Sequence, residues 1–179
     1  MTPEFSIQPI LENDNVILNP LEEKHFDALY EVASDPEIWV QHPNKDRWQK
    51  DIFKTFFLGA LESKGAFIIV DKISGQVIGS SRFYDDNAED DCIFIGYTFY
   101  ATDYWGNGFN KMVKKLMLDY IFQFVSKVHF HIGANNIRSQ IAIGRVGAEK
   151  IAEEEVAYFG EASRNNFVYE ITKEYWKTR

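Results

Sequence analysis

Residues 104–110 form the segment Tyr104-Trp105-Gly106-Asn107-Gly108-Phe109-Asn110, and an apolar pattern with helical spacing begins within it. Two glycines one residue apart predict a tight turn, because glycine adopts left-handed backbone angles without steric cost. The buried side of the helix is predicted from apolar residues at three- and four-residue steps, namely Phe109, Val113, Leu116, Met117, Tyr120, Ile121 and Phe124. The other side, which we expect to meet solvent, carries Lys111, Lys114, Lys115 and Asp119.

A glycine-bearing turn that opens a helix directs its backbone N–H groups toward an anion, and a pyrophosphate is the anion we expect. A Gly-x-Gly pair by itself is more often an ordinary loop, so the order of the surrounding elements has to decide. The chain has no Gly-x-x-x-x-Gly-Lys-Ser/Thr and no complete Gly-x-Gly-x-x-Gly with a βαβ unit. Nucleoside triphosphate chemistry and hydride transfer are therefore disfavoured.

On either side of this turn, hydrophobic periodicity and turn residues predict seven strands and four helices. The strands cover residues 16–18, 67–70, 77–84, 93–99, 127–132, 150–158 and 167–172, and the helices cover 22–33, 48–63, 109–124 and 136–146. Helices interspersed with strands indicate an α+β fold, in which a mixed sheet of about seven strands has helices on its faces. We expect one domain over residues 1–179, with residues 1–15 as an N-terminal arm.

Composition narrows the classes of function. With 179 residues, 45% of them hydrophobic, the chain can bury the core of one ordinary domain. A net charge of −8 disfavours nucleic acid as a partner, because phosphate backbones require clustered lysine and arginine. No apolar run is long enough to span a bilayer and no secretory signal precedes the first strand, so we expect no membrane partner and a cytoplasmic location.

The residues that bind metals in other proteins are scattered here. Cys92 lies in an apolar strand without a cysteine or histidine at metal-ligand spacing, which favours a buried inert thiol. His129 and His131 alternate with apolar residues on one face of a strand, so no metal site is predicted. Residues 85–91 contain five acids. They form either a solvated turn between two strands, which is the more common case, or an attractor for a cation or amine.

Four groups of residues resemble, in order, the GNAT superfamily of acetyl-CoA-dependent N-acetyltransferases, and within it the RimJ/RimL type that acetylates ribosomal-protein N-termini. They are Asn19-Pro20-Leu21-Glu22-Glu23 with Asp35-Pro36-Glu37, Ile95-Gly96-Tyr97 with the glycine turn, Asn136-Ile137-Arg138-Ser139 with Gly147-Ala148, and Phe167-Val168-Tyr169-Glu170 with Glu174-Tyr175-Trp176. The resemblance spans the chain from Val16 onward. It implies a GNAT fold with a mostly antiparallel sheet.

The resemblance also implies a site for acetyl-CoA or coenzyme A, with no metal. Transfer from a thioester needs anchored phosphates, an extended pantetheine arm and a polarised carbonyl. The phosphates are assigned to Trp105, Gly106, Asn107, Gly108, Phe109 and Asn110. The arm is assigned to a strand over residues 95–100 that splays from its neighbour, with backbone contacts from Phe99 and Tyr100. The remaining phosphate charge falls to Lys111, Lys114, Lys115 or Arg145, unless these lysines only solvate a helix face.

Two further residues complete the expected site. The resemblance makes Asn136 a hydrogen-bond partner of the cofactor arm, and makes Ser139 the catalytic residue that protonates the departing thiolate. Both also suit an ordinary helix start, in which Asn136 caps the first turn. A nearby tyrosine is an alternative acid.

One position departs from the family pattern. Members of this branch often carry a glutamate two residues before the Gly-Tyr pair, where this chain has Phe94. A protonated amine must lose a proton before it attacks, and phenylalanine cannot accept one. The candidates for the base are Glu37, His42 and Asp85.

Two functions follow from these expectations. The first is transfer of acetyl from acetyl-CoA to a primary amine in a ternary complex, with a protein N-terminus or a small amine as acceptor and with a monomer or homodimer as the working unit. The second is a module that binds coenzyme A with little or no turnover.

Overall fold

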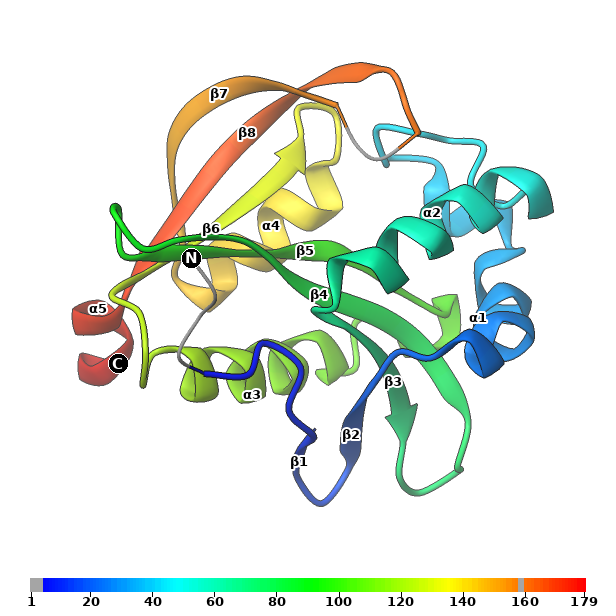
Figure 1. Ribbon diagram of the computed structural model, residues 1–179, viewed down its shortest axis with the longest axis horizontal. Coiled ribbons are helices and arrows are strands. Elements are labelled where there is room, and N and C mark those ends of the chain that lie inside the picture. The colour runs from blue at the N-terminus through cyan, green and yellow to red at the C-terminus, as the bar shows by residue number, and fades with distance from the viewer. Residues whose placement is uncertain (1–4, 158–159) are drawn as a thin grey trace.

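The computed structural model describes residues 5–157 and 160–179. Their strands form one eight-stranded sheet in the order β1-β2-β3-β4-β5-β6-β8-β7 (Figure 1). The strands are β1 (Leu11–Glu12), β2 (Val16–Pro20), β3 (Ala66–Asp71), β4 (Val77–Asn87), β5 (Cys92–Tyr100), β6 (Lys127–Gly133), β7 (Glu149–Ala157) and β8 (Ser163–Thr172). Neighbours pair antiparallel except β5 and β6, which pair parallel. The predicted mixed α+β class is confirmed.

Five α-helices lie in the described part of the chain. They are α1 (Phe26–Ala33), α2 (Lys50–Ser63), α3 (Phe109–Ile121), α4 (Ile137–Val146) and α5 (Lys173–Thr178), with short 3-10 helices η1 (Glu23–His25), η2 (Pro36–Trp39) and η3 (Thr102–Tyr104). They cover both faces of the sheet (Figure 1). The buried hydrophobic residues form two clusters, and the strand alternation of β3 contributes to both. Phe67 and Ile69 pack with α3, while Ile68 packs with α1 and α2.

The prediction of about seven strands and four helices was one short in each class. The missed strand, β1, has two residues and lies in the range assigned to the N-terminal arm. The missed helix, α5, has six residues. Neither is long enough to display a hydrophobic period, so tertiary packing decides both. The predicted strand over residues 150–158 is found as β7, and its last predicted residue lies outside the described residues.

The helix after the glycine turn is shorter than predicted. It ends at Ile121, and Phe124, which we placed on its buried side, leaves 43% of its surface exposed. The longest described helix, α2, has 14 residues. Within residues 5–157 and 160–179, no helix has both the length and the apolar character that a bilayer crossing needs.

The parallel pair of strands diverges after a short contact. Cys92–Phe94 of β5 pair with residues 127–129 of β6, and the described register between the two strands ends there. The strands run on to Tyr100 and Gly133. This is the splayed arrangement that the resemblance implies. A bulge adds to it, because the β4–β5 register shifts opposite Tyr97, whose φ of 54° is left-handed.

Candidate functional site

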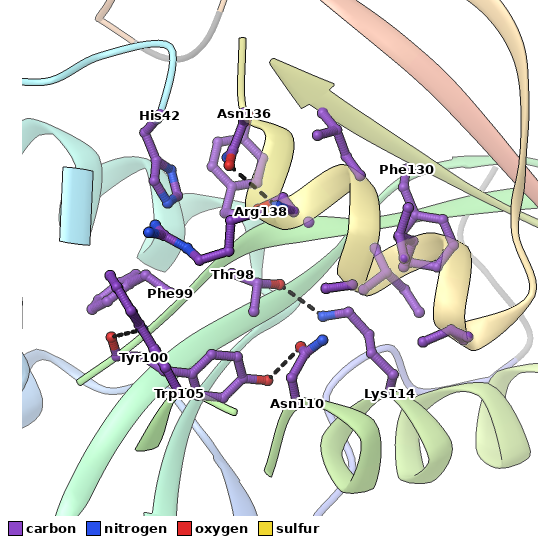
Figure 2. A pocket seen from close by; sticks show the side chains of 18 of the residues that line it. His42, Thr98, Phe99, Tyr100, Trp105, Asn110, Lys114, Phe130, Asn136 and Arg138 are labelled. Carbon is purple, nitrogen blue, oxygen red and sulfur yellow. Dashed lines mark hydrogen bonds between the residues drawn. The ribbon is translucent and has the colours of Figure 1, made fainter. Parts of the chain in front are cut away.

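A cleft of about 550 Å³ opens where β5 and β6 diverge. Helices α3 and α4 border it (Figure 2), and Gly106 and Gly108 of the glycine turn are among its lining residues. Eight of the ten residues assigned to the site from sequence line this cleft: Phe99, Tyr100, Trp105, Gly106, Gly108, Asn110, Asn136 and Ser139. Residues from three segments of the chain, 99–100, 105–110 and 136–139, therefore meet at one cavity.

The glycine turn has the backbone that its sequence predicts. Gly106 has a φ of 73° and Gly108 a φ of 89°, and a Cβ added at either position would meet no atom within 4 Å. Gly108 is the N-cap of α3, so the first N–H groups of that helix lack intrahelical acceptors. Open space above unpaired donors and the positive end of a helix dipole together suit a phosphate.

The side chains of Asn107 and Phe109 point away from the cleft. The Asn107 side chain donates to the Asp103 carbonyl at 3.4 Å and is exposed, and the Phe109 ring packs edge-on against Tyr104 with 4.9 Å between centroids. Their side chains are not among those that line the cleft. Any contribution of Asn107 and Phe109 to ligand binding would therefore come from their backbone groups.

The cleft-facing side of α3 is polar. Lys114 is only 4% exposed, and its Nζ donates to Thr98 Oγ1 at 2.9 Å (Figure 2). One turn earlier, Asn110 Oδ1 accepts from the Tyr100 hydroxyl at 3.0 Å. The prediction that Lys114 lies on a solvent-facing side is wrong, because the helix is covered by sheet and cleft on that side too. Lys111 and Arg145 line the cleft, whereas Lys115 pairs with Asp119 on the surface.

Burial lowers the pKa of Lys114 to about 7. Above this pH the unfolded chain binds more protons than the folded one, so the free energy of unfolding rises with pH. Below about pH 7 both states bind the Lys114 proton, and this residue adds no pH dependence. Unfolding in urea at several pH values between about 7 and 8.5 measures this rise. We expect Lys114→Met to remove a slope of at most about 1.4 kcal/mol per pH unit. A stability difference between the two proteins that is constant with pH would contradict this expectation.

The start of α4 is tied to the segment before α2. Asn136 is 3% exposed, and its Oδ1 accepts from the Ser139 N–H at 3.3 Å, so the capping contact expected at a helix start is present. The Arg138 N–H donates to Gln41 Oε1 at 2.9 Å. The Arg138 guanidinium donates to the Ile38 carbonyl at 3.1 Å and lies 3.8 Å from the Trp105 ring centroid. These contacts fix one wall of the cleft.

The strand residues assigned to the cofactor arm alternate in direction. Phe99 is buried among the aromatic rings of the α1–α2 side, for example 5.0 Å from Trp39. Tyr100 points to the α3 side, and its carbonyl accepts from the Trp105 indole N–H at 3.1 Å. Phe99 also lines the cleft, and we expect its contact with an extended ligand to come from its backbone groups.

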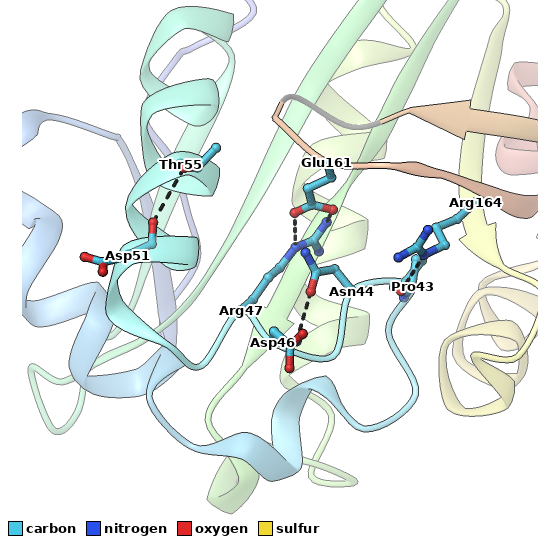
Figure 3. A network of polar contacts seen from close by, with 8 residues as sticks. All are labelled: Pro43, Asn44, Asp46, Arg47, Asp51, Thr55, Glu161 and Arg164. Carbon is cyan, nitrogen blue, oxygen red and sulfur yellow. Dashed lines mark hydrogen bonds and ion pairs between the residues drawn. The ribbon is translucent and has the colours of Figure 1, made fainter.

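Arg47 also lines the cleft, and it forms a bidentate ion pair with Glu161 from the turn between β7 and β8 (Figure 3). The two distances are 2.7 and 2.8 Å, and the side chains are 3% and 8% exposed. Nearby, Arg164 donates to the Pro43 carbonyl at 3.3 Å. The β7–β8 hairpin is thereby fastened to the loop that carries His42.

The three residues proposed as bases lie in different surroundings. His42 lines the cleft, and desolvation foremost, followed by Arg47 and Arg138, lowers its pKa to about 3. It is therefore uncharged at neutral pH. Glu37 is exposed in the first turn of η2, away from the cleft lining. Asp85 lines a second cavity of about 780 Å³, formed mainly by residues 85–90 with Cys92, Phe94, His129, His131 and Glu154.

A hydrogen-bonded row of three side chains was not anticipated from sequence. The Tyr84 hydroxyl lies 3.3 Å from His131 Nδ1, and His131 Nε2 lies 2.9 Å from Glu154 Oε2. The His131 ring stacks on Phe94 with 4.3 Å between centroids. The strand pattern does place His129 and His131 on one face, as predicted. It contains no signal for partners on β4 and β7.

Comparison with known proteins gives one family match. The model of the acetyltransferase (GNAT) domain matches residues 15–149. Among solved structures, the chain is similar to a GCN5-related N-acetyltransferase from Brucella melitensis, with a TM-score of 0.82 and 19% identity over 95% of this chain and 81% of that one.

Two further structures have named acceptors. A ribosomal-protein-S5-alanine acetyltransferase from Vibrio fischeri has a TM-score of 0.68 and 14% identity over 94% of this chain and 99% of that one. A spermidine N-acetyltransferase from Vibrio cholerae, in complex with CoA and spermine, has a TM-score of 0.66 and 15% identity over 92% and 99%. At these identities the likeness is one of fold.

Proposed function

We propose, from the premise that this chain belongs to the acetyltransferase (GNAT) domain family, that it transfers acetyl from acetyl-CoA to a primary amine by direct attack in a ternary complex. The observation that supports this proposal most is that two structural features, the diverging strands and the glycine turn, line the same cleft. Diverging strands β5 and β6 leave backbone groups for an extended arm, and a glycine turn at the start of α3 faces the same space.

The proposed roles combine this geometry with what the family resemblance implies. The diphosphate of coenzyme A lies over Gly106 and Gly108, where no Cβ obstructs the N–H groups. The pantetheine amides pair with the backbone of β5 near Phe99, and the thioester lies toward the bulge at Tyr97. Asn136 and Ser139 face the arm from α4, with Ser139 as the proton donor to the departing thiolate. A preorganised donor at the carbonyl oxygen lowers the barrier by about 3 kcal/mol.

The acceptor is a primary amine, and two classes are proposed. The RimJ/RimL resemblance favours a protein N-terminus, and the Vibrio fischeri structure is named for an alanine acceptor of this kind. A small polyamine is the other class, since the Vibrio cholerae structure holds spermine. A second candidate function, a coenzyme A module with little turnover, is favoured by Phe94 at the position where the branch often has glutamate.

Release of free thiol from acetyl-CoA tests the proposal. The acceptors are spermidine, spermine and a peptide that begins with alanine, and a reaction without amine is the control. We expect at least one acceptor to raise thiol release above the control, with acetylated amine as the product. Saturable binding of coenzyme A without amine-dependent release would favour the binding module, and absence of both would overturn the two candidates together.

A further inference from the structure

Lys114 on α3 brings a buried amine into the cleft, and none of the proposed roles uses it. The residue lines the cleft and is only 4% exposed. Figure 2 shows its side chain pointing toward Thr98, and the bond from Nζ to Thr98 Oγ1 at 2.9 Å is its one hydrogen bond to the described residues. A neutral lysine keeps a lone pair on Nζ besides its N–H donors. Desolvation is one of the ways in which proteins turn such an amine into a nucleophile.

The charges of the cleft favour the neutral form of this lysine. None of the described residues that line the cleft is an aspartate or glutamate, and the titratable ones include three tyrosines and two histidines. The other charged ones are Lys111, Arg47, Arg138 and Arg145. Glu161 pairs with Arg47 from outside this lining. Burial without a carboxylate in the lining thus lowers the pKa of Lys114 to about 7, so about half of the molecules carry a neutral Nζ at pH 7.

Helix α3 runs alongside β5, and this places Lys114 on the path proposed for the cofactor arm. The Tyr100 hydroxyl of β5 donates to Asn110 of α3. Two residues earlier on β5, Thr98 accepts from Lys114, which lies four residues further along α3. Two residues of a strand and four of a helix both span about 6–7 Å, so the two elements stay in step. An arm that starts over the glycine turn and follows β5 therefore meets Lys114 at Thr98, the neighbour in sequence of Tyr97, beside which we place the thioester.

We propose that Lys114 is a self-acetylation site, which bound acetyl-CoA modifies when no acceptor amine is present. This inference rests on the proposed binding of acetyl-CoA in the cleft. The lone pair of neutral Nζ adds to the thioester carbon and forms the N–C bond. The C–S bond breaks, the sulfur keeps its electron pair, and one of the two Nζ protons goes to the thiolate. The products are an acetylated Lys114, which has lost its charge, and free coenzyme A.

Mass spectrometry of peptides from wild-type protein, incubated with acetyl-CoA in the absence of amine, tests this site. Two lysines of the same helix are the matched controls. Lys115 has a side chain that is 59% exposed and pairs with Asp119, and Lys111 is an exposed residue of the cleft lining. A reagent that attacks from solution would label these accessible lysines first. We expect Lys114 to be acetylated at least about 100-fold faster than either, because a thioester held beside an amine reaches an effective concentration of about 10⁵ M or more.

Concentration, pH and unfolding separate a reaction in the cleft from ordinary lysine chemistry. The rate at Lys114 should saturate with acetyl-CoA and fall when coenzyme A is added, whereas the rate at Lys115 should stay proportional to acetyl-CoA. From about pH 6 to about pH 8 the rate at Lys114 should rise about tenfold and then level off, because its pKa is about 7. An ordinary lysine continues to gain neutral form, about tenfold per pH unit, up to its pKa of about 10.4. In concentrated urea, which removes the cleft, the preference for Lys114 should disappear.

Two outcomes would overturn the self-acetylation site. One is a Lys114 that stays unmodified or is acetylated no faster than Lys115, and the other is a preference for Lys114 that persists in urea. Thiol release with an added amine would in both cases leave the proposed function standing. Protein that neither binds coenzyme A nor releases thiol would overturn the proposed function together with the site.

Discussion

Replacing Gly106 with valine is expected to weaken the binding of coenzyme A by at least about 100-fold, because two or more charge-assisted hydrogen bonds to phosphate, worth about 1.5–3 kcal/mol each, would be lost. The valine side chain would occupy the open space over the turn, where we place the diphosphate. Isothermal titration of the folded variant with coenzyme A measures the effect. The turn is exposed, so little packing is lost.

Gly75→Val is the matched control for backbone strain. Gly75 lies in the β3–β4 turn with a φ of 74°, against 73° for Gly106, and a Cβ there also meets no atom within 4 Å. A β-branched residue in this left-handed conformation costs both variants a similar free energy of folding, about 1–2 kcal/mol. Only Gly106 lines the cleft. Equal affinities of the two variants for coenzyme A would contradict the assignment of the turn to the diphosphate.

Glu161→Gln is expected to lower the free energy of unfolding by about 3 kcal/mol, since it removes the negative partner of a guanidinium that is itself only 3% exposed. For a chain of this size the melting temperature should fall by roughly 6–12 °C. Chemical unfolding in urea gives the free energy, and differential scanning calorimetry gives the melting temperature. Because Arg47 lines the cleft, a lower affinity for coenzyme A should accompany the loss of stability.

An exposed ion pair on the same hairpin provides the control. Lys150 and Glu153 lie 2.8 Å apart with side chains 40% and 56% exposed, so Glu153→Gln should change the stability by no more than about 0.5 kcal/mol. If both variants are equally stable, the pair between Arg47 and Glu161 does not hold the hairpin in the way its burial indicates.

Local signals explain what the sequence predicted well. The left-handed angles of Gly106 and Gly108 and the start of α3 at Phe109 depend on neighbours within a few residues. The same is true of the end of α4, where Gly147 has a φ of 108°. The cleft lining was accessible only through the family resemblance, since no local pattern brings α4 close to the glycine turn.

The failures have a common physical cause. The helical wheel of α3 places Lys114 opposite the apolar residues, but it cannot show that a second element covers that side. The row of Tyr84, His131 and Glu154 joins β4, β6 and β7, which β5 and β8 separate in the sheet. The alternation of apolar and polar residues predicts which face of the sheet a side chain lies on. Which side chains it meets on that face depends on the pairing of strands that are distant in sequence.

The short contact between β5 and β6 has a consequence for how the protein avoids self-association. Beyond Phe94, the edges of β5 and β6 that face each other carry backbone donors and acceptors that the described register leaves without strand partners. Unpaired strand edges at the periphery of a sheet are templates for intermolecular β-pairing and fibril growth. Here they border the cleft that residues of α3 and α4 also line, and in the proposed complex the pantetheine amides would cover them.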